Sequence, residues 1–419
     1  MKPATIALLA VCLNFFGREF AYVIGVLIGV PVEKLMPDNA WRAQSLVTMG
    51  IVFAVIAAAF TWARLFSRDQ QSLCDVVLIL NRRREDLGSC LLLVAALGLV
   101  LPIVLSADLE FDVVGRGVGQ FERDIGGAWI RLSLLALPIV AFMLFAYRLS
   151  RLSVVILALA SVAVVVADIS NGNRRLVMYA GVVALSLLAL RLSWQRVSGS
   201  RHNWLPAIVA FIVGFLLGTA YLLRVLVGGD GIFGFGHFVY LLLLGTVGGL
   251  GTSAILWHTQ QIMSQWTGLL YGKTFLAYTW SLLVPSVFLY ALGFDEFLAR
   301  SAYLFDGYYN SNPNMGYDFM MLADFVWNFG DAGFALYAAI AAGTIVLIDR
   351  FWKSPSAAYR AVAVVLCVYW SAGQRSDFGF FLKGAAYGIV TIAAVVVVVR
   401  SLGRASLLGS IGSRQSAGR

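Results

Sequence analysis

The stretch Gly384-Ala-Ala-Tyr-Gly-Ile-Val-Thr-Ile-Ala-Ala-Val-Val-Val-Val-Val399 contains no charged residue, and Arg400 follows it directly. It is the centre of a predicted helix over 378–399, and about 20 apolar residues are enough for a helix to cross a bilayer. Similar runs recur along the chain, because 60% of its 419 residues are hydrophobic and only 13% are charged. A soluble fold could not bury so much apolar surface. The sequence therefore predicts an all-α polytopic integral membrane protein.

Ten apolar runs are long enough to span a membrane if some helices are short or tilted. They cover residues 5–30, 45–66, 87–106, 129–147, 152–168, 176–190, 204–227, 325–348, 361–373 and 378–399. Two further runs, 238–256 and 275–292, either span as an extra pair, giving twelve helices, or belong to an external region. We predict about ten spans in four parts: helices 1–7 in 1–227, a periplasmic re-entrant or interfacial region in 228–322, helices 8–10 in 323–400, and a disordered cytoplasmic tail in 401–419.

Basic residues are distributed unevenly over the predicted loops. If the N-terminus is cytoplasmic, more than half of the 31 basic residues but fewer than a quarter of the 22 acidic residues lie inside. This asymmetry is what the positive-inside rule requires, and the opposite orientation would invert it. Both termini are then cytoplasmic. The net charge of +9 indicates topology and contact with anionic inner-leaflet lipid rather than binding of nucleic acid.

Two arginine-bearing segments open predicted helices on the outer side of the membrane. Asn-Arg174-Arg175 precedes the sixth span, and Arg375-Ser-Asp377 precedes the tenth. A cation is disfavoured at the positive end of a helix dipole, whereas a phosphate is favoured there. Because arginine adds bidentate donors, both segments predict a site for a phosphate or diphosphate. Alternatively, the arginines extend to lipid headgroups or pair with Asp168 and Asp377.

A second group of polar residues lies in Asp324-Phe-Val-Trp-Asn328-Phe-Gly-Asp331. On one helix, Asp324, Asn328 and Asp331 are spaced i, i+4 and i+7, so they form one polar stripe on the eighth span. Polar residues inside spans mark binding sites or cavities. The Asp324 carboxylate is a candidate general base, or a group that orients a sugar by hydrogen bonds. Alternatively, Asp324 caps the helix and Asn328 bonds a neighbouring helix.

Two residues of the external region are secondary candidates. His258 could assist proton transfer, although an interfacial hydrogen-bonding role is the simpler interpretation. Lys273 ends the segment Trp-Thr-Gly-Leu-Leu-Tyr-Gly-Lys and is a candidate for phosphate contact. The four cysteines have no metal-ligand spacing, and the chain contains none of the common motifs for metals or nucleoside triphosphates. We therefore expect neither a metal nor another cofactor.

Four segments follow one another along the chain: Asn-Arg174-Arg175, Tyr271-Gly-Lys273-Thr, Asn328-Phe-Gly-x-x-Gly333 and Gln-Arg375-Ser-Asp377. This ordered set resembles the Wzy-type O-antigen or oligosaccharide repeat-unit polymerases. The resemblance covers roughly residues 165–395, and the Tyr-Gly-Lys-Thr and Asn-Phe-Gly-x-x-Gly segments are its most specific parts. At two positions the chain departs from the family pattern: Ser286 stands where members often have arginine, and Asp324 where they often have glutamate.

The resemblance implies a metal-independent membrane glycosyltransferase, similar to the GT-C type, in a bacterial inner membrane. Members act at the periplasmic face on undecaprenyl-diphosphate-linked oligosaccharides, which serve as both donor and acceptor. They move a growing glycan from its lipid diphosphate to the terminal sugar hydroxyl of a new repeat unit. A chain-length copolymerase is a possible partner. The alternatives are an O-antigen ligase, which transfers the glycan to lipid A core, and a polyprenyl-linked glycan transporter.

The resemblance also implies roles for individual residues. The diphosphate-binding residues would be Arg174, Arg175, Arg375 and Lys273, which stabilise the charge that develops on the leaving group. The catalytic candidates are Asp324, as base or in positioning the acceptor, then Asp318 and His258, together with Arg375. The glycan-positioning residues would be Asn328, Tyr317 and Asp377.

Overall fold

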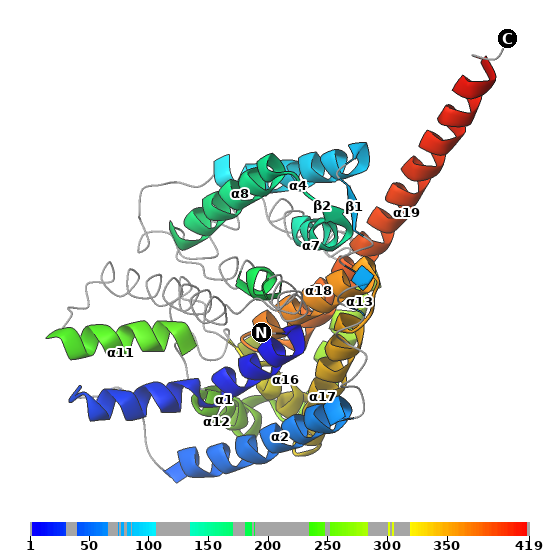
Figure 1. Cartoon of the computed structure of the whole chain (residues 1–419). Coiled ribbons are helices and arrows are strands. Elements are labelled where there is room, and N and C mark those ends of the chain that lie inside the picture. Colours follow the sequence, from blue (N-terminus) through cyan, green and yellow to red (C-terminus); the bar gives the residue numbers. More distant parts are fainter. Residues whose placement is uncertain are drawn as a thin grey trace.

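The computed structural model describes residues 2–30, 40–65, 74, 77–78, 82–84, 86–105, 135–170, 181–186, 188, 234–247, 252–283, 301, 304–305 and 319–416. Within these ranges the chain is almost entirely helical (Figure 1). Two short strands, β1 (Arg83–Arg84) and β2 (Tyr147–Arg148), form a parallel pair. The predicted helical architecture is confirmed.

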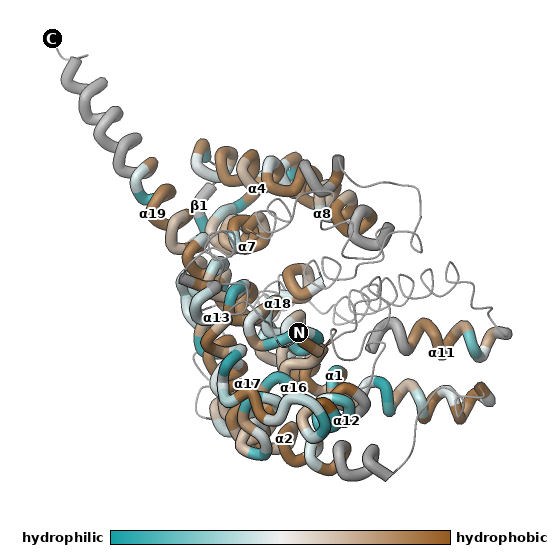
Figure 2. The backbone as a smooth tube through the Cα atoms, turned by 180° about the vertical axis from the view of Figure 1, so that it is seen from behind, coloured by the Kyte–Doolittle hydropathy of each residue, from teal (hydrophilic) through white to brown (hydrophobic). Residues whose placement is uncertain are grey.

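In the described part of the chain, four helices contain segments long and apolar enough to cross a membrane: α1 (Pro3–Leu27), α2 (Ala40–Leu65), α17 (Ala332–Trp352) and α19 (Phe378–Ser416). Four others carry shorter apolar segments: α4 (Leu87–Leu105), α7 (Ala136–Ala146), α8 (Arg151–Ser170) and α18 (Ala357–Gly373). Figure 2 shows hydrophobic residues predominating along α4 and α8. These helices support a membrane-embedded protein. The total of ten spans stays a prediction, since 204–227 lies outside the described residues.

The predicted external region contains short helices: α11 (Gly234–Val247), α12 (Thr252–Ile262), the π-helix η2 (Met263–Thr267) and α13 (Lys273–Leu283). α11 has 14 residues, and α12 and α13 have 11 each. The runs 238–256 and 275–292 extend beyond the described residues, so whether they span stays a prediction. α11 packs against α1, and α12 packs against α1, α2 and α16 (Met321–Phe329).

α1 and α18 run side by side in the same direction. The Cys367 Sγ lies 3.1 Å from the backbone oxygen of Pro3, and the Asn14 Nδ2 donates to the backbone oxygen of Gln374 at 3.0 Å. Pro3 precedes Asn14 on α1, and Cys367 precedes Gln374 on α18, so the two helices are parallel. Because Asn14 is near the middle of α1, the turn that follows α18 lies beside the middle of α1.

The predicted eighth span, 325–348, consists of two helices that meet at a glycine corner. α16 ends at Phe329, and Gly330 has a φ of 58°, in the left-handed region that favours glycine. At Gly333, in the first turn of α17, an added Cβ would collide with the backbone oxygen of Phe325. The local structure therefore explains both glycines of the Asn-Phe-Gly-x-x-Gly segment. Gly330 ends one helix, and Gly333 allows the next helix to pack tightly on it.

This corner makes the prediction of one polar stripe wrong. Asp324 and Asn328 both lie on α16 and are fully buried. Asp331 lies beyond the corner, next to α17, and is exposed. The i, i+4 part of the pattern is thus correct, and the i+7 part fails because the helix does not continue.

The C-terminal segment also differs from the prediction. α19 continues as a helix to Ser416, through most of the tail predicted to be disordered. Figure 1 shows this helix projecting away from the others.

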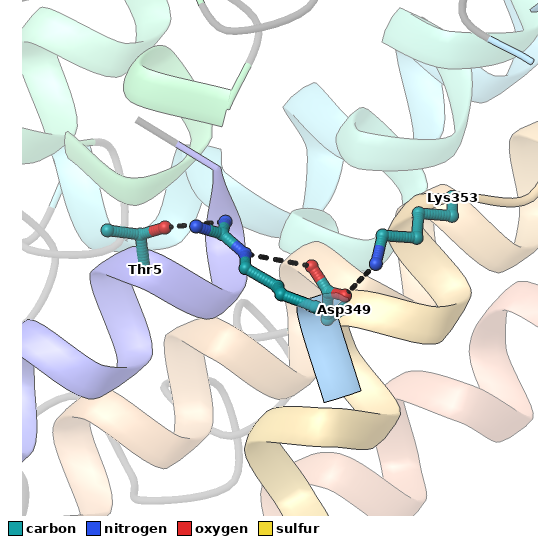
Figure 3. Close-up of polar contacts among 4 residues, drawn as sticks. Thr5, Asp349 and Lys353 are labelled. Atoms are coloured by element: carbon teal, nitrogen blue, oxygen red, sulfur yellow. Dashed lines mark hydrogen bonds and ion pairs between the residues drawn. The ribbon is translucent and has the colours of Figure 1, made fainter. Parts of the chain in front are cut away.

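Three helix ends meet at Asp349, which is 3% exposed (Figure 3). Arg64, near the end of α2, donates from its guanidinium to the Thr5 Oγ1 at 3.0 Å, and its Nε lies 3.9 Å from the Asp349 Oδ1. Lys353 pairs with the other oxygen of Asp349. The start of α1 and the ends of α2 and α17 therefore lie together, as the predicted topology requires. That this end is cytoplasmic stays a prediction.

Candidate functional site

The centre of the candidate site is the carboxylate of Asp324, whose side chain is 0% exposed. Its Oδ1 accepts hydrogen bonds from the Ser301 Oγ and, at 3.0 Å, from the Asn328 Nδ2. The Thr274 Oγ1 lies 3.3 Å from the same oxygen. Three side chains therefore surround one carboxylate oxygen, and two of them, Ser301 and Thr274, are distant from Asp324 in sequence.

The second oxygen of Asp324 connects to two further elements. The Asp324 Oδ2 accepts from the Tyr278 hydroxyl at 3.0 Å and from the backbone N–H of Phe378 at 2.9 Å. Tyr278 lies on α13, and Phe378 is the first residue of α19. The carboxylate thus joins α13, Ser301 and α19 to α16.

Electrostatics explains why so many donors surround Asp324. Burial and, after it, the nearby carboxylate of Asp377 raise the pKa of Asp324, which lies outside the four candidate spanning helices. Hydrogen bonds from Ser301, the Phe378 N–H and Tyr278 act in the opposite direction. A buried carboxylate is tolerated only when such donors compensate for its lost hydration. Both oxygens are engaged within the protein, so in this conformation Asp324 does not face a substrate.

Asn328 completes the network from the same face of α16. Its Nδ2 donates to the Thr274 Oγ1 at 2.7 Å and to the Asp324 backbone oxygen at 2.8 Å. The interpretation in which Asn328 bonds a neighbouring helix is therefore confirmed. The same interpretation held that Asp324 caps its own helix, and this part is wrong. Asp324 instead accepts from the first backbone N–H of α19.

Arg375 lies in the turn between α18 and α19 and is half-buried. Its backbone N–H donates to the Ala372 oxygen at 3.2 Å, so its backbone still extends the end of α18. The Asp377 Oδ1 accepts from the Phe380 N–H at 2.9 Å, which makes Asp377 the N-cap of α19. Asp324 binds the Phe378 N–H.

Two carboxylates of the chain therefore occupy the N-terminus of α19. The dipole of this helix has its anionic partners without a phosphate, which corrects the argument that predicted a phosphate there. Any anion bound at this turn would depend on the Arg375 side chain rather than on the helix end.

Lys273 begins α13 and is exposed, next to the buried Thr274. The following residue, Phe275, stacks on Phe378 with ring centroids 5.2 Å apart and planes at 19°. The start of α13 is thus packed on the start of α19. Lys273 and Arg375 therefore flank the same junction between helices.

His258 lies on α12 and is half-buried. Burial lowers the pKa of His258, and a hydrogen bond with Gln261 partly offsets this. Although α12 packs against α16, His258 is not among the side chains that hydrogen-bond to Asp324 in the described part of the chain.

Four predicted site residues lie outside the described residues: Arg174, Arg175, Tyr317 and Asp318. Their roles stay predictions. Among the residues that are described, no group of three or more His, Cys, Asp or Glu side chains is placed to hold a metal ion.

The network includes residues that the sequence analysis did not select. Thr274 and Tyr278 are four residues apart, so they lie on one face of α13, and this spacing was a usable signal beside the Tyr-Gly-Lys-Thr segment. Ser301 carried no such signal. The segments containing Thr274, Asn328 and Arg375 nevertheless converge on one centre. No protein-family model, no curated protein and no solved structure matches this chain.

Proposed function

We propose that this chain is a membrane glycosyltransferase that polymerises lipid-linked glycans, as O-antigen polymerases do. One observation carries the proposal: three of the motifs behind that resemblance meet at Asp324. Thr274 follows Tyr-Gly-Lys, Asn328 opens Asn-Phe-Gly-x-x-Gly, and Phe378 follows Gln-Arg-Ser-Asp. The contacts of Thr274 and Phe378 with Asp324 span 50 and 54 residues of sequence. Segments that converge in this way act together, which is what a shared site requires.

In the proposed reaction, the C1–O bond between the growing glycan and its undecaprenyl diphosphate breaks. A C1–O bond to the terminal sugar hydroxyl of a new repeat unit forms, and a base takes the hydroxyl proton. The leaving diphosphate gains negative charge, which fixed cations stabilise. Arg375 and Lys273 are the described candidates for this role. Arg174 and Arg175 remain proposed partners.

The geometry supports Asp324 as a positioning residue more than as the base. A base needs a lone pair directed at the acceptor hydroxyl, and both oxygens of Asp324 already accept from protein donors. By holding α13 and α19 together, Asp324 would keep Lys273 and Arg375 at one junction. Asp318 and His258 remain the proposed bases, and Asn328, Tyr317 and Asp377 the proposed glycan-positioning residues.

We place the reaction at the periplasmic side of a bacterial inner membrane, because the positive-inside rule puts the Arg375 turn outside. Donor and acceptor are both undecaprenyl-diphosphate-linked oligosaccharides, and a chain-length copolymerase is a proposed partner.

The test is complementation of a strain from which the gene for this chain has been deleted. The strain should make lipopolysaccharide cores that carry a single repeat unit, and the wild-type gene should restore the ladder of longer chains. Arg375→Ala should abolish the ladder, and Arg375→Lys should restore it in part, since lysine keeps the charge but loses the bidentate fork. Arg350→Ala is the matched control, because Arg350 is exposed at the far end of α17.

Other outcomes would overturn the proposal. Cores without any repeat unit in the deletion strain, with long lipid-linked glycan accumulating outside, would indicate a ligase. Lipid-linked single units retained on the cytoplasmic side would indicate a transporter. A ladder of normal length and intensity with Arg375→Ala would exclude Arg375 as the electrostatic catalyst.

A further inference from the structure

Two arginine-bearing segments are held next to each other by the strand pair. The parallel pairing of β1 with β2 places Arg84 opposite Arg148. Just before β1, the Arg82 Nε donates to the backbone oxygen of Phe145, at the end of α7, over 3.4 Å. These backbone contacts fix both segments. The proposed reaction gives no role to Arg82 or Arg148.

The charges of Arg82 and Arg148 oppose each other. Arg82 is half-buried, and its burial lowers its pKa. The nearby guanidinium of Arg148 lowers the pKa of Arg82 further. Both effects disfavour the charged form of Arg82, and an anion bound to the two guanidinium groups would offset both. Arg148 is exposed, so a ligand can reach the pair from its side.

The two helices that follow the strands begin side by side. α4 starts three residues after β1 ends, α8 starts three residues after β2 ends, and the two helices pack against each other (Figure 1). One N–H group in the first turn of each helix already has a partner. The Ser89 N–H donates to the Asp86 Oδ1 at 2.9 Å, and the Ser153 N–H donates to the Ser150 Oγ at 3.2 Å. An anion at this end would therefore depend on the arginine side chains rather than on the helix ends.

The strand pair lies at the same end of the bundle as Asp349. The Phe145 ring packs edge-on against Trp352, with ring centroids 5.7 Å apart, and Trp352 lies three residues after Asp349 on α17. The predicted topology makes this end cytoplasmic. Anionic phospholipid headgroups of the inner leaflet attract basic side chains there.

An exposed apolar face runs along α8 from this end. Arg151, the first residue of α8, is exposed. Three apolar residues follow it at i+4, i+8 and i+11 and therefore share its face: Val155, Leu159 and Val162 are 52%, 65% and 61% exposed. The acyl chains of a phospholipid can pack on this face while the headgroup stays at the arginines. Inorganic phosphate has no part that would use it.

We propose that Arg82 and Arg148 bind the phosphate of an anionic phospholipid of the cytoplasmic leaflet, with its acyl chains along the exposed face of α8 that begins at Arg151. Arginine provides paired N–H donors that match the oxygens of a phosphate group. The apolar face favours a phospholipid over a free phosphate ion. This inference does not depend on the proposed reaction.

The test uses the full chain in phosphatidylcholine nanodiscs that contain increasing fractions of phosphatidylglycerol. A ligand of the folded state raises the melting temperature, and a defined site saturates. We expect a saturating rise for wild type. Arg148→Gln, at an exposed position, should weaken the apparent affinity for phosphatidylglycerol about tenfold or more, because it removes a charged donor. Arg350→Gln, an exposed arginine at the same end, is the matched control and should respond as wild type does.

Arg82→Lys tests the half-buried member of the pair. Lysine keeps the charge but loses the planar fork, so the affinity should lie between those of wild type and Arg148→Gln. Wild-type affinity with Arg82→Lys would remove the fork of Arg82 from the proposal.

Other results would overturn the proposal. An absent rise in wild type, or an equal rise in wild type and Arg148→Gln, would exclude the arginine pair as a lipid site. An equal rise with inorganic phosphate in pure phosphatidylcholine would assign the pair to a free anion. Native mass spectrometry gives a second readout, in which wild type should retain phosphatidylglycerol after transfer into detergent. A lipid-free dimer would instead assign the face of α8 to a second copy of the chain.

Discussion

The carboxylate of Asp324 accepts hydrogen bonds from three separate segments of the chain, those of Ser301, Tyr278 and Phe378. Asp324→Ala would leave the Ser301 and Tyr278 hydroxyls and the Phe378 N–H buried without this acceptor, and each such loss costs about 1–3 kcal/mol. We expect a fall of more than about 3 kcal/mol in the free energy of unfolding, measured in detergent. Asp331→Ala, an exposed aspartate beyond the same corner, is the control and should change stability little.

Asp324→Asn distinguishes positioning from base catalysis. Asparagine keeps the size and one acceptor oxygen, but its NH₂ group would face donors such as Tyr278 and the Phe378 N–H. We expect an intermediate loss of stability, with a loss of polymer that follows it. Polymer synthesis abolished at wild-type melting temperature would instead restore Asp324 as the general base.

Residue patterns predicted part of this site and missed the rest for physical reasons. The i, i+4 spacing correctly placed Asp324 and Asn328 on one face, because helical periodicity is a local property. The patterns did not assign Asp377 its role as the N-cap of α19. Ser301 was not predictable, since its contact with Asp324 depends on the tertiary path of a segment without periodic signal.

Among the elements, the corner between α16 and α17 has the sharpest sequence requirement. Gly333→Ala would put a Cβ against the Phe325 backbone oxygen, and backbone cannot move aside as a flexible side chain can. We expect a loss of about 1–3 kcal/mol in stability, as for overpacking elsewhere. Gly343→Ala is the matched control on α17, because a Cβ at Gly343 meets nothing within 4 Å. It should be neutral or slightly stabilising, since alanine favours helix. Equal melting temperatures for the two variants would contradict the close packing of Gly333 against the Phe325 backbone.

The same elements show why a correct local argument failed at α19. From sequence, its N-terminus has unpaired N–H groups beside Arg375 and therefore favours an anion. One anion, Asp377, comes from the same segment, but the second, Asp324, lies 54 residues before Phe378 in the sequence. Helix ends are predictable from sequence, whereas the partner that satisfies them is set by packing.

At the scale of the whole molecule, polar contacts among Thr5, Arg64, Asp349 and Lys353 join α1, α2 and α17 at one end of the bundle. Asp349→Ala would remove the carboxylate between Arg64 and Lys353 and leave two cations facing each other. We expect a loss of roughly 1–3 kcal/mol, smaller at high salt if the repulsion is screened. Thermal unfolding at two salt concentrations measures this, with Arg350→Ala as the control. A stability unchanged by Asp349→Ala would show that apolar packing alone joins α1, α2 and α17.

Hydropathy and charge predicted a helical membrane protein well, because both are sums over many residues. They left the choice between ten and twelve spans open, and one contact in the fold is relevant to this choice. The Trp327 Nε1 donates to the Thr267 Oγ1 at 3.0 Å, so the segment before α13 lies at the α16 end of the bundle. α17 leads from there to Asp349. With twelve spans, the segment around Thr267 would be cytoplasmic, on the same side as Asp349; its contact with α16 favours ten.

Cysteine labelling in intact cells tests this directly. Trp266 is 69% exposed, and Arg350 is exposed near Asp349. The background replaces Cys12, Cys74 and Cys90 by serine and keeps Cys367, which is buried. We expect Trp266→Cys to react with a membrane-impermeant maleimide from outside, and Arg350→Cys only after permeabilisation. Labelling of both from outside, or of both only after permeabilisation, would indicate twelve spans. Labelling of Arg350→Cys alone from outside would invert the orientation and move the Arg375 turn to the cytoplasmic side, where a periplasmic polymerase could not use it.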